Sequence, residues 1–124
     1  MTRLDKPAGE ASCPPKPGLE ERSLLAAREA TELAELFKVL GNDTRLKMLF
    51  VLTKAQELGV TELAILMGMK PQAVSNQLQM LRHRGILGCR REGVHIIYRI
   101  LDPCVISLLE YGLCLNEDAK ARKS

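Results

Sequence analysis

Apolar residues in the middle of the chain recur at helical spacing. Three of them fall at positions i, i+4 and i+7, which places them on one stripe of a helix: Val74, Leu78 and Leu81. Pro71 suits the first helical turn, where its missing N–H costs no hydrogen bond, and Gly85 suits the position just past a helix end. The pattern therefore predicts a helix over about Pro71 to Arg84 that turns its apolar stripe toward a core.

The opposite face of this helix carries uncharged polar side chains. They are Gln72, Ser75, Asn76 and Gln79. A merely solvated helix face usually favours Lys and Glu, and neither residue type occurs between positions 71 and 81. Amide groups form paired hydrogen bonds with base edges in a major groove, and hydroxyl groups form single ones. The pattern therefore favours base readout over a solvated surface.

Further helices are predicted before this segment. Residues 19–40 have the pattern of one amphipathic helix, and a second helix is expected over about 43–53. Arg45 should point outward from this second helix, where it could meet a DNA phosphate, although a surface arginine is more often simply solvated. A short helix is expected over 61–67 with Thr61 as its cap, and it would brace the longer helix that follows.

A hairpin and a last helix are predicted after it. Residues 86–101 alternate as two strands joined by a turn at 92–93. Arg90 and Arg91 near the tip would lie against phosphates or in a minor groove, and the affinity that they add would fall with salt. The alternative is a charged turn that keeps the hairpin soluble. The final helix is expected over about 102–117.

This order of elements is that of a helix-turn-helix followed by a wing. The expected fold class is mainly α with a β-hairpin, a winged helix-turn-helix that binds DNA. Residues 1–18 hold four of the six prolines and few apolar residues, so an N-terminal arm is expected there. The domain would cover 19–118, and residues 119–124 would form a polar tail.

Four consecutive segments look like the signatures of the ArsR/SmtB family of metal-sensing winged-helix repressors. They are LGNDTRLKMLFVL, VTELA, AVSNQLQMLRHRGIL and RREGVHIIYRI, and the resemblance covers about 32–117. It implies a homodimer that binds double-stranded operator DNA and pairs its first and last helices at the dimer interface. Gln77 stands where the family often has His, and Val94 stands where a basic wing residue is common. These departures concern the operator sequence rather than the fold.

Length, charge and the motifs that are absent limit the class of protein further. The 124 residues suit one domain, and a net charge of +3 permits DNA binding without demonstrating it. No apolar run approaches the roughly 18 residues of a membrane span, and no signal peptide is visible, so a cytoplasmic protein without membrane contact is expected. Catalysis is not expected, because no nucleophile stands near a base and no phosphate-binding glycine loop occurs.

Four cysteines supply the candidate chemistry: Cys13, Cys89, Cys104 and Cys114. In a cytosolic regulator such thiols tend toward metal binding or redox roles. Cys104 and Cys114 lie ten residues apart on one predicted helix, roughly 15 Å along its axis, which is too far to share one ion. If two copies of this helix cross antiparallel in a dimer, Cys104 can approach the partner's Cys114. Similar zinc sensors carry acids and imidazoles in this region.

Thiolates in place of imidazoles favour thiophilic ions such as Hg(II), Cd(II), Pb(II) or As(III) over Zn(II). Cys89 or Cys13 could supply a third sulfur. The expected function is a repressor that binds its operator as an apo dimer and is released when such an ion binds. The simpler alternative is that these cysteines are small buried apolar residues that only pack against their neighbours. A thiol redox or persulfide switch using the same cysteines is the other alternative, and a DNA-binding module without a ligand also stays open.

Overall fold

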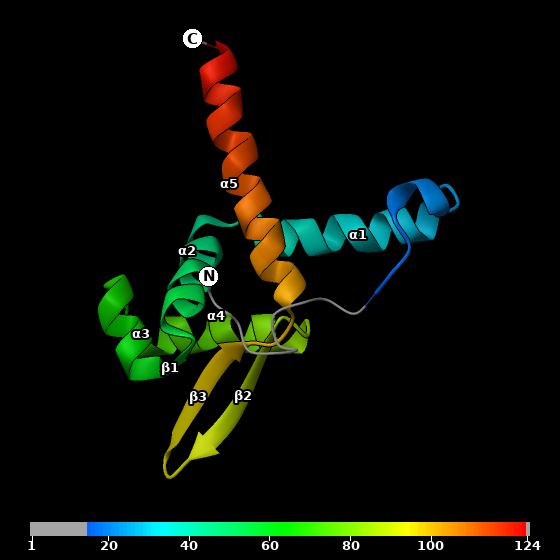
Figure 1. Cartoon of the computed structure of the whole chain (residues 1–124). Coiled ribbons are helices and arrows are strands. Elements are labelled where there is room, and N and C mark those ends of the chain that lie inside the picture. Colours follow the sequence, from blue (N-terminus) through cyan, green and yellow to red (C-terminus); the bar gives the residue numbers. More distant parts are fainter. Residues whose placement is uncertain (1–14, 124) are drawn as a thin grey trace.

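The computed structural model describes residues 15–123. Figure 1 shows a body formed by α2, α3, α4 and the sheet, from which α1 and α5 project in different directions and the hairpin points away. The elements in chain order are η1 Leu19–Glu21, α1 Ala27–Leu40, α2 Asp43–Ala55, β1 Glu57–Gly59, α3 Val60–Met67, α4 Pro71–His83, β2 Leu87–Glu92, β3 His95–Ile100 and α5 Pro103–Lys123. The predicted winged helix-turn-helix is confirmed. None of the helices in the described part is long and apolar enough to cross a membrane.

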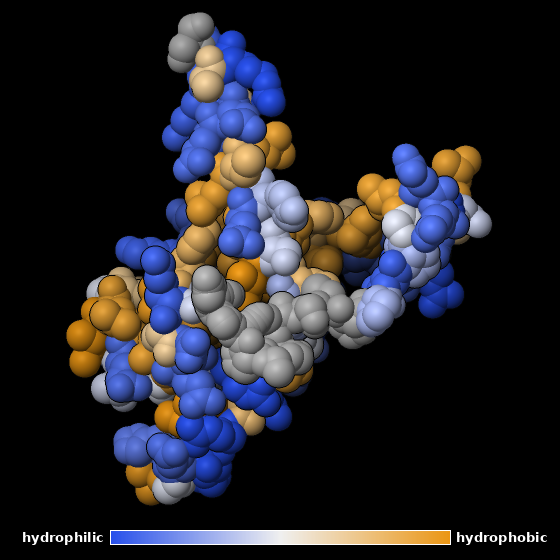
Figure 2. Space-filling view, viewed as in Figure 1, coloured by the Kyte–Doolittle hydropathy of each residue, from blue (hydrophilic) through white to orange (hydrophobic). Residues whose placement is uncertain are grey.

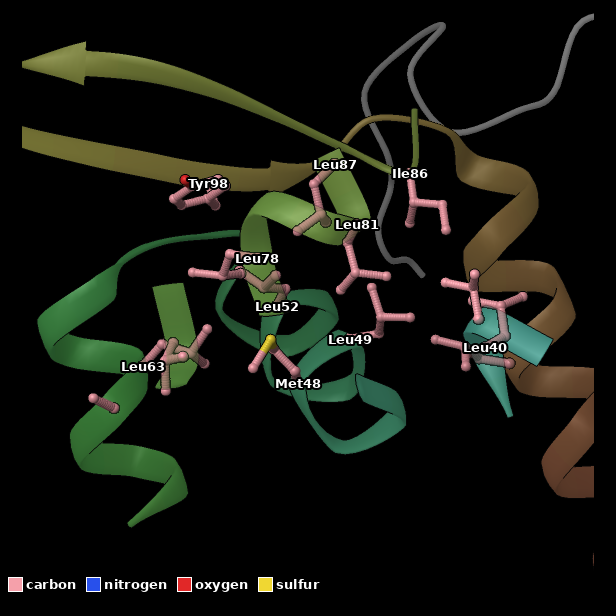
Figure 3. Packing of buried hydrophobic residues seen from close by; sticks show 14 residues of the cluster. Leu40, Met48, Leu49, Leu52, Leu63, Leu78, Leu81, Ile86, Leu87 and Tyr98 are labelled. Atoms are coloured by element: carbon pink, nitrogen blue, oxygen red, sulfur yellow. The ribbon is translucent and has the colours of Figure 1, made fainter. Parts of the chain in front are cut away.

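The predicted stripe of α4 forms the centre of the core (Figure 3). Its side chains at Val74, Leu78 and Leu81 are fully buried. They pack with apolar side chains from α2, α3 and the sheet, including Met48, Leu49, Leu52, Leu63, Leu87 and Tyr98. Burial of this stripe fixes which side of α4 faces outward, because residues on the opposite side of the same helix are left exposed.

The sheet has three strands in the order β1-β3-β2, all antiparallel. Strand β1 was not predicted, because three residues are too few to show an alternating pattern. The hairpin turn lies at 93–94 rather than 92–93, since Glu92 still pairs with His95 and Gly93 adopts the left-handed conformation with φ +65°.

Two helix starts differ from the prediction. Helix α1 begins at Ala27 rather than Leu19, because the backbone N–H of Ala26 donates to the Glu29 carboxylate at 2.9 Å and caps the helix there. Helix α3 begins at Val60, and the N–H of its N-cap Gly59 donates to Glu62 at 3.0 Å, so Thr61 is not the cap. In both cases a glutamate three residues into the helix sets the boundary.

Helix α5 opens as predicted but runs further. The carboxylate of Asp102 accepts a hydrogen bond from the backbone N–H of Cys104 at 2.9 Å, which caps the helix before Pro103. The helix continues to Lys123, past the predicted end near Glu117. Three basic residues in its last turn, Lys120, Arg122 and Lys123, suit the negative end of the helix dipole.

Candidate nucleic-acid interface and thiol positions

The polar face of α4 is ordered by two hydrogen bonds within the helix. The Gln72 amide donates to Asn76 Oδ1 at 3.0 Å, and the Gln79 amide donates to Ser75 Oγ at 3.2 Å. Gln72, Asn76 and Gln79 are exposed, while Ser75 is half-buried. Each exposed amide keeps donors or acceptors for another partner, and α4 carries no acidic residue that would repel a phosphate. The arrangement is suited to base edges.

The two wing arginines occupy different environments. Arg90 donates to Glu57 Oε1 at 2.7 Å and to Glu92 Oε2 at 2.6 Å. These bonds raise the pKa of Arg90, and the hydrogen bond from Arg90 holds the pKa of Glu57 below its usual value. Arg91 is exposed and points to the other side of the strand. Two carboxylates thus neutralise the charge of Arg90, whereas Arg91 keeps its charge available on the wing.

Arg45 does not point outward as predicted. It is half-buried, and its Nε donates to the backbone carbonyl of Val39 at 2.6 Å. Its Nη1 donates to Gln77 Oε1 at 3.0 Å. The apolar spacing of α2 could not predict these bonds, because one partner, Gln77, lies on α4, 32 positions further along the sequence. The bond also turns the Gln77 carbonyl toward α2.

The cysteines lie on separate elements. Cys13 falls outside the described residues. Cys89 on β2 is half-buried against the core opposite Tyr98, whose pKa is raised by burial and by the nearby thiol. Cys104, half-buried in the first turn of α5, is disulfide-bonded. Cys114 is exposed further along α5, with its sulfur 3.7 Å from a carboxylate oxygen of Asp118.

One chain does not assemble a metal site from the residues described. Among them, no three His, Cys, Asp or Glu side chains are grouped so that they could hold an ion. Cys104 and Cys114 belong to the same straight helix, ten residues apart, so they lie roughly 15 Å apart along its axis. A shared ion therefore requires a sulfur from another copy of the chain or from outside the described residues.

Apolar side chains gather between α1 and α5, where Figure 2 shows orange surface between the two projecting helices. Phe37 on α1 is 50% exposed, and Leu113 on α5 is 44% exposed. A hollow of about 360 Å³ lies between these helices and α2, lined by apolar residues that include Phe37, Leu46, Phe50, Leu108 and Leu113. Large exposed apolar side chains of this kind are typical of a surface that binds another molecule.

The sequence and the fold both match known regulators. The family model described as "Bacterial regulatory protein, arsR family" matches residues 42–87. The chain is 34% identical over 86 residues to a cadmium resistance transcriptional regulatory protein CadC homolog of Staphylococcus aureus, covering 69% of this chain and 71% of that protein. It is 34% identical over 93 residues to the HTH-type transcriptional regulator NmtR of Mycobacterium tuberculosis, covering 75% and 77%.

A solved structure resembles the chain over almost its whole length. The crystal structure of the AntR antimony-specific transcriptional repressor superposes with a TM-score of 0.73 at 55% sequence identity, covering 89% of this chain and 99% of that one. The solution structure of apo-NmtR superposes with a TM-score of 0.66 at 33% identity, covering 82% and 87%.

Proposed function

The chain belongs to the ArsR family of winged-helix transcriptional repressors, which is not a family of enzymes, and from this premise we propose that it is a homodimer that binds operator DNA in its apo form and is released by a thiophilic ion. The observation that carries the DNA-binding part is the uncharged face of α4. Its amides stand outward because Val74, Leu78 and Leu81 on the opposite side are buried. In a dimer, two such helices would enter major grooves about one helical turn apart.

The surface between α1 and α5 supports a dimer. A small domain gains buried apolar area by pairing, and the exposed side chains of Phe37, Leu108 and Leu113 surround a hollow that a second copy would fill. Antiparallel crossing of two α5 helices would bring Cys104 of one subunit toward the partner's Cys114. Two symmetric thiolate sites would result, with Cys89 or Cys13 as the third sulfur.

Chemistry and similarity together favour a metalloid as the inducer. Thiolates are soft ligands, and three sulfurs suit a trivalent ion of the As(III) type. The AntR repressor, described as antimony-specific, is 55% identical to this chain, so Sb(III) and As(III) are the first candidate inducers. Cd(II), Hg(II) and Pb(II) follow. Because Cys104 is disulfide-bonded, binding of any of these ions requires its prior reduction.

That same disulfide favours a second candidate, a repressor that responds to thiol oxidation. A transcriptional reporter under the protein's own promoter separates the two. With the protein present, Sb(III) or As(III) should induce the reporter while a mild oxidant such as diamide does not. Induction by diamide alone would favour the redox function, and no repression in the absence of inducer would contradict a repressor altogether.

Removing the amides of the reading face should weaken operator binding without changing its salt dependence. We expect the double variant Gln72→Ala and Asn76→Ala to lose about 1–3 kcal/mol of binding free energy, the range for a good paired base contact. Amide groups release no counterions, so the slope of log K against log salt should stay unchanged. Fluorescence anisotropy with a labelled operator duplex at several salt concentrations measures both. Equal loss of affinity for unrelated DNA would contradict base readout.

The two wing arginines should differ in their contribution to DNA binding. Arg91→Ala should reduce the magnitude of the salt slope by about 0.9 per subunit, because one phosphate contact is lost. Arg90→Ala is the matched variant, and it should change the slope less because Glu57 and Glu92 already neutralise that guanidinium. The same anisotropy titrations give the slopes. A larger slope change for Arg90→Ala than for Arg91→Ala would place the phosphate contact at Arg90 and contradict its assignment to Arg91.

A further inference from the structure

Arg45 joins three helices through one guanidinium. It stands in the first turn of α2, where its backbone N–H donates to Asn42 Oδ1 at 3.0 Å. Its side chain donates to the carbonyl of Val39 at the end of α1 and to the amide oxygen of Gln77 on α4. The last turn of α1, the start of α2 and the middle of α4 are therefore held by the same residue.

The bond to Val39 satisfies a need of α1. The last four carbonyls of a helix have no partner within it, and Val39 is the last but one residue of α1. The partial negative charge at this end attracts a cation. In its own helix, however, Arg45 sits near the positive N-terminal end, where a cation is disfavoured. The dipole of α2 therefore does not explain this arginine, whereas its contacts with α1 and α4 do.

The bond to Gln77 acts on the reading helix. Gln77 is half-buried and lies on the flank of α4, between the buried stripe and the polar face. Unlike the Gln72 and Asn76 pair, which lies within α4, the bond between Arg45 and Gln77 connects α4 to another element. A paired contact with a base tolerates little displacement. Rotation of α4 about its axis would redirect Gln72 and Asn76 together.

We propose that Arg45 is a positioning residue for operator recognition, which locks α4 to the last turn of α1 by bonding Val39 and Gln77 at once. This inference rests on the proposed function, because operator DNA is what α4 would read. Helix α1 also carries Phe37 of the surface proposed for dimerisation. The two bonds from Arg45 to Val39 and Gln77, called the lock below, thus connect the geometry of the dimer to the orientation of the reading helix.

Four variants test the lock: Arg45→Met, Gln77→Leu, their combination, and Lys47→Met as the control. The exposed Lys47 provides the control because its loss removes the same charge from α2 without breaking either bond. Arg45→Met and Gln77→Leu should each weaken operator binding about tenfold, the scale of one hydrogen bond to a charged group. The combination should be no weaker than the worse single variant, since both variants remove the bond between Arg45 and Gln77, and Arg45→Met alone already removes the bond to Val39. The salt slope of Gln77→Leu should equal that of the parent, and Arg45→Met should change the slope no more than Lys47→Met does.

Two results would overturn this inference. If Arg45→Met lowers the salt slope by about 0.9 more than Lys47→Met does, and Gln77→Leu binds as the parent does, then Arg45 contacts a phosphate and the inference is overturned. Additive losses in the combination would overturn it as well. Should Arg45→Met fail to fold by circular dichroism, Gln77→Leu carries the test alone, because its affinity must still fall with an unchanged slope.

Hydrogen exchange provides a readout without DNA. Amide protection in the middle of α4 should fall in Arg45→Met and in Gln77→Leu, and it should be unchanged in Lys47→Met. Unchanged protection in the first two variants would refute the lock. A parent protein that binds no operator but shows this pattern would refute the proposed function while leaving the lock in place, so the two failures are distinguishable.

Discussion

Serine in place of Cys104 or Cys114 is expected to abolish release of the operator by a thiophilic ion. In the parent, the ion should lower operator affinity by about 5–150-fold, the usual range of 1–3 kcal/mol for coupling between two sites. In either variant the same ion should leave affinity unchanged, because a hydroxyl is a poor ligand for a soft ion. Affinity without the ion should match the parent, since neither residue lies on α4 or the hairpin. Anisotropy titrations with reduced protein measure both quantities.

Mixed dimers show whether the site lies between subunits. A dimer of one Cys104→Ser chain and one Cys114→Ser chain keeps Cys104 on the second chain and Cys114 on the first, so one intersubunit pair is restored. Such a mixture should recover ion-dependent release, although each variant alone does not. A mixture as unresponsive as the two variants would contradict the crossing of the α5 helices. Release in either serine variant alone would mean that its cysteine is not a ligand.

Shortening Leu78 to alanine should cost about 2–5 kcal/mol of unfolding free energy, the range for removing a leucine from a core. The side chain is fully buried beneath the reading helix, where it packs with the core residues of α2 and the sheet. A domain of this kind has only about 5–15 kcal/mol in total. Urea unfolding followed by circular dichroism at one fixed protein concentration measures the loss, because dimer stability depends on concentration.

Met80→Ala is the matched variant for this measurement. Met80 lies two residues further along the same helix and is 41% exposed. Its replacement should change unfolding free energy by less than about 1 kcal/mol, since partly exposed positions leave a smaller cavity. Equal losses in the two variants would show that the stripe of α4 is not the centre of the core.

The winged helix could be predicted from the chain because its elements have strong local signals. The stripe of α4 and the alternation of the hairpin follow directly from hydrophobic spacing, and Pro71 marks the start of a helix. The start of α1 could not be placed, because Leu24 and Leu25 continue the apolar pattern although neither belongs to the core, with 97% and 56% exposure. Hydrophobic spacing predicts a helix only where tertiary packing uses it.

The environment of the basic residues was not accessible to sequence reasoning. Arg90 looks like a contact for phosphate until β1 brings Glu57 within 2.7 Å of it. Arg45 looks solvated until α4 packs against α2. In both cases the partner is more than 30 positions away, so only the folded chain pairs the charges. The proposed thiolate site requires a second copy of the chain, so it remains a prediction.

The most direct test of the central claim is the operator affinity of the reduced, metal-free protein with and without Sb(III). The duplex should cover the DNA upstream of its own gene, and As(III) and Zn(II) should be titrated in parallel. We predict tight binding without ions, a fall of at least about fivefold with Sb(III) or As(III), and little change with Zn(II). Affinity that no thiophilic ion lowers, in protein shown to bind the operator, would contradict the account of a thiolate-controlled repressor.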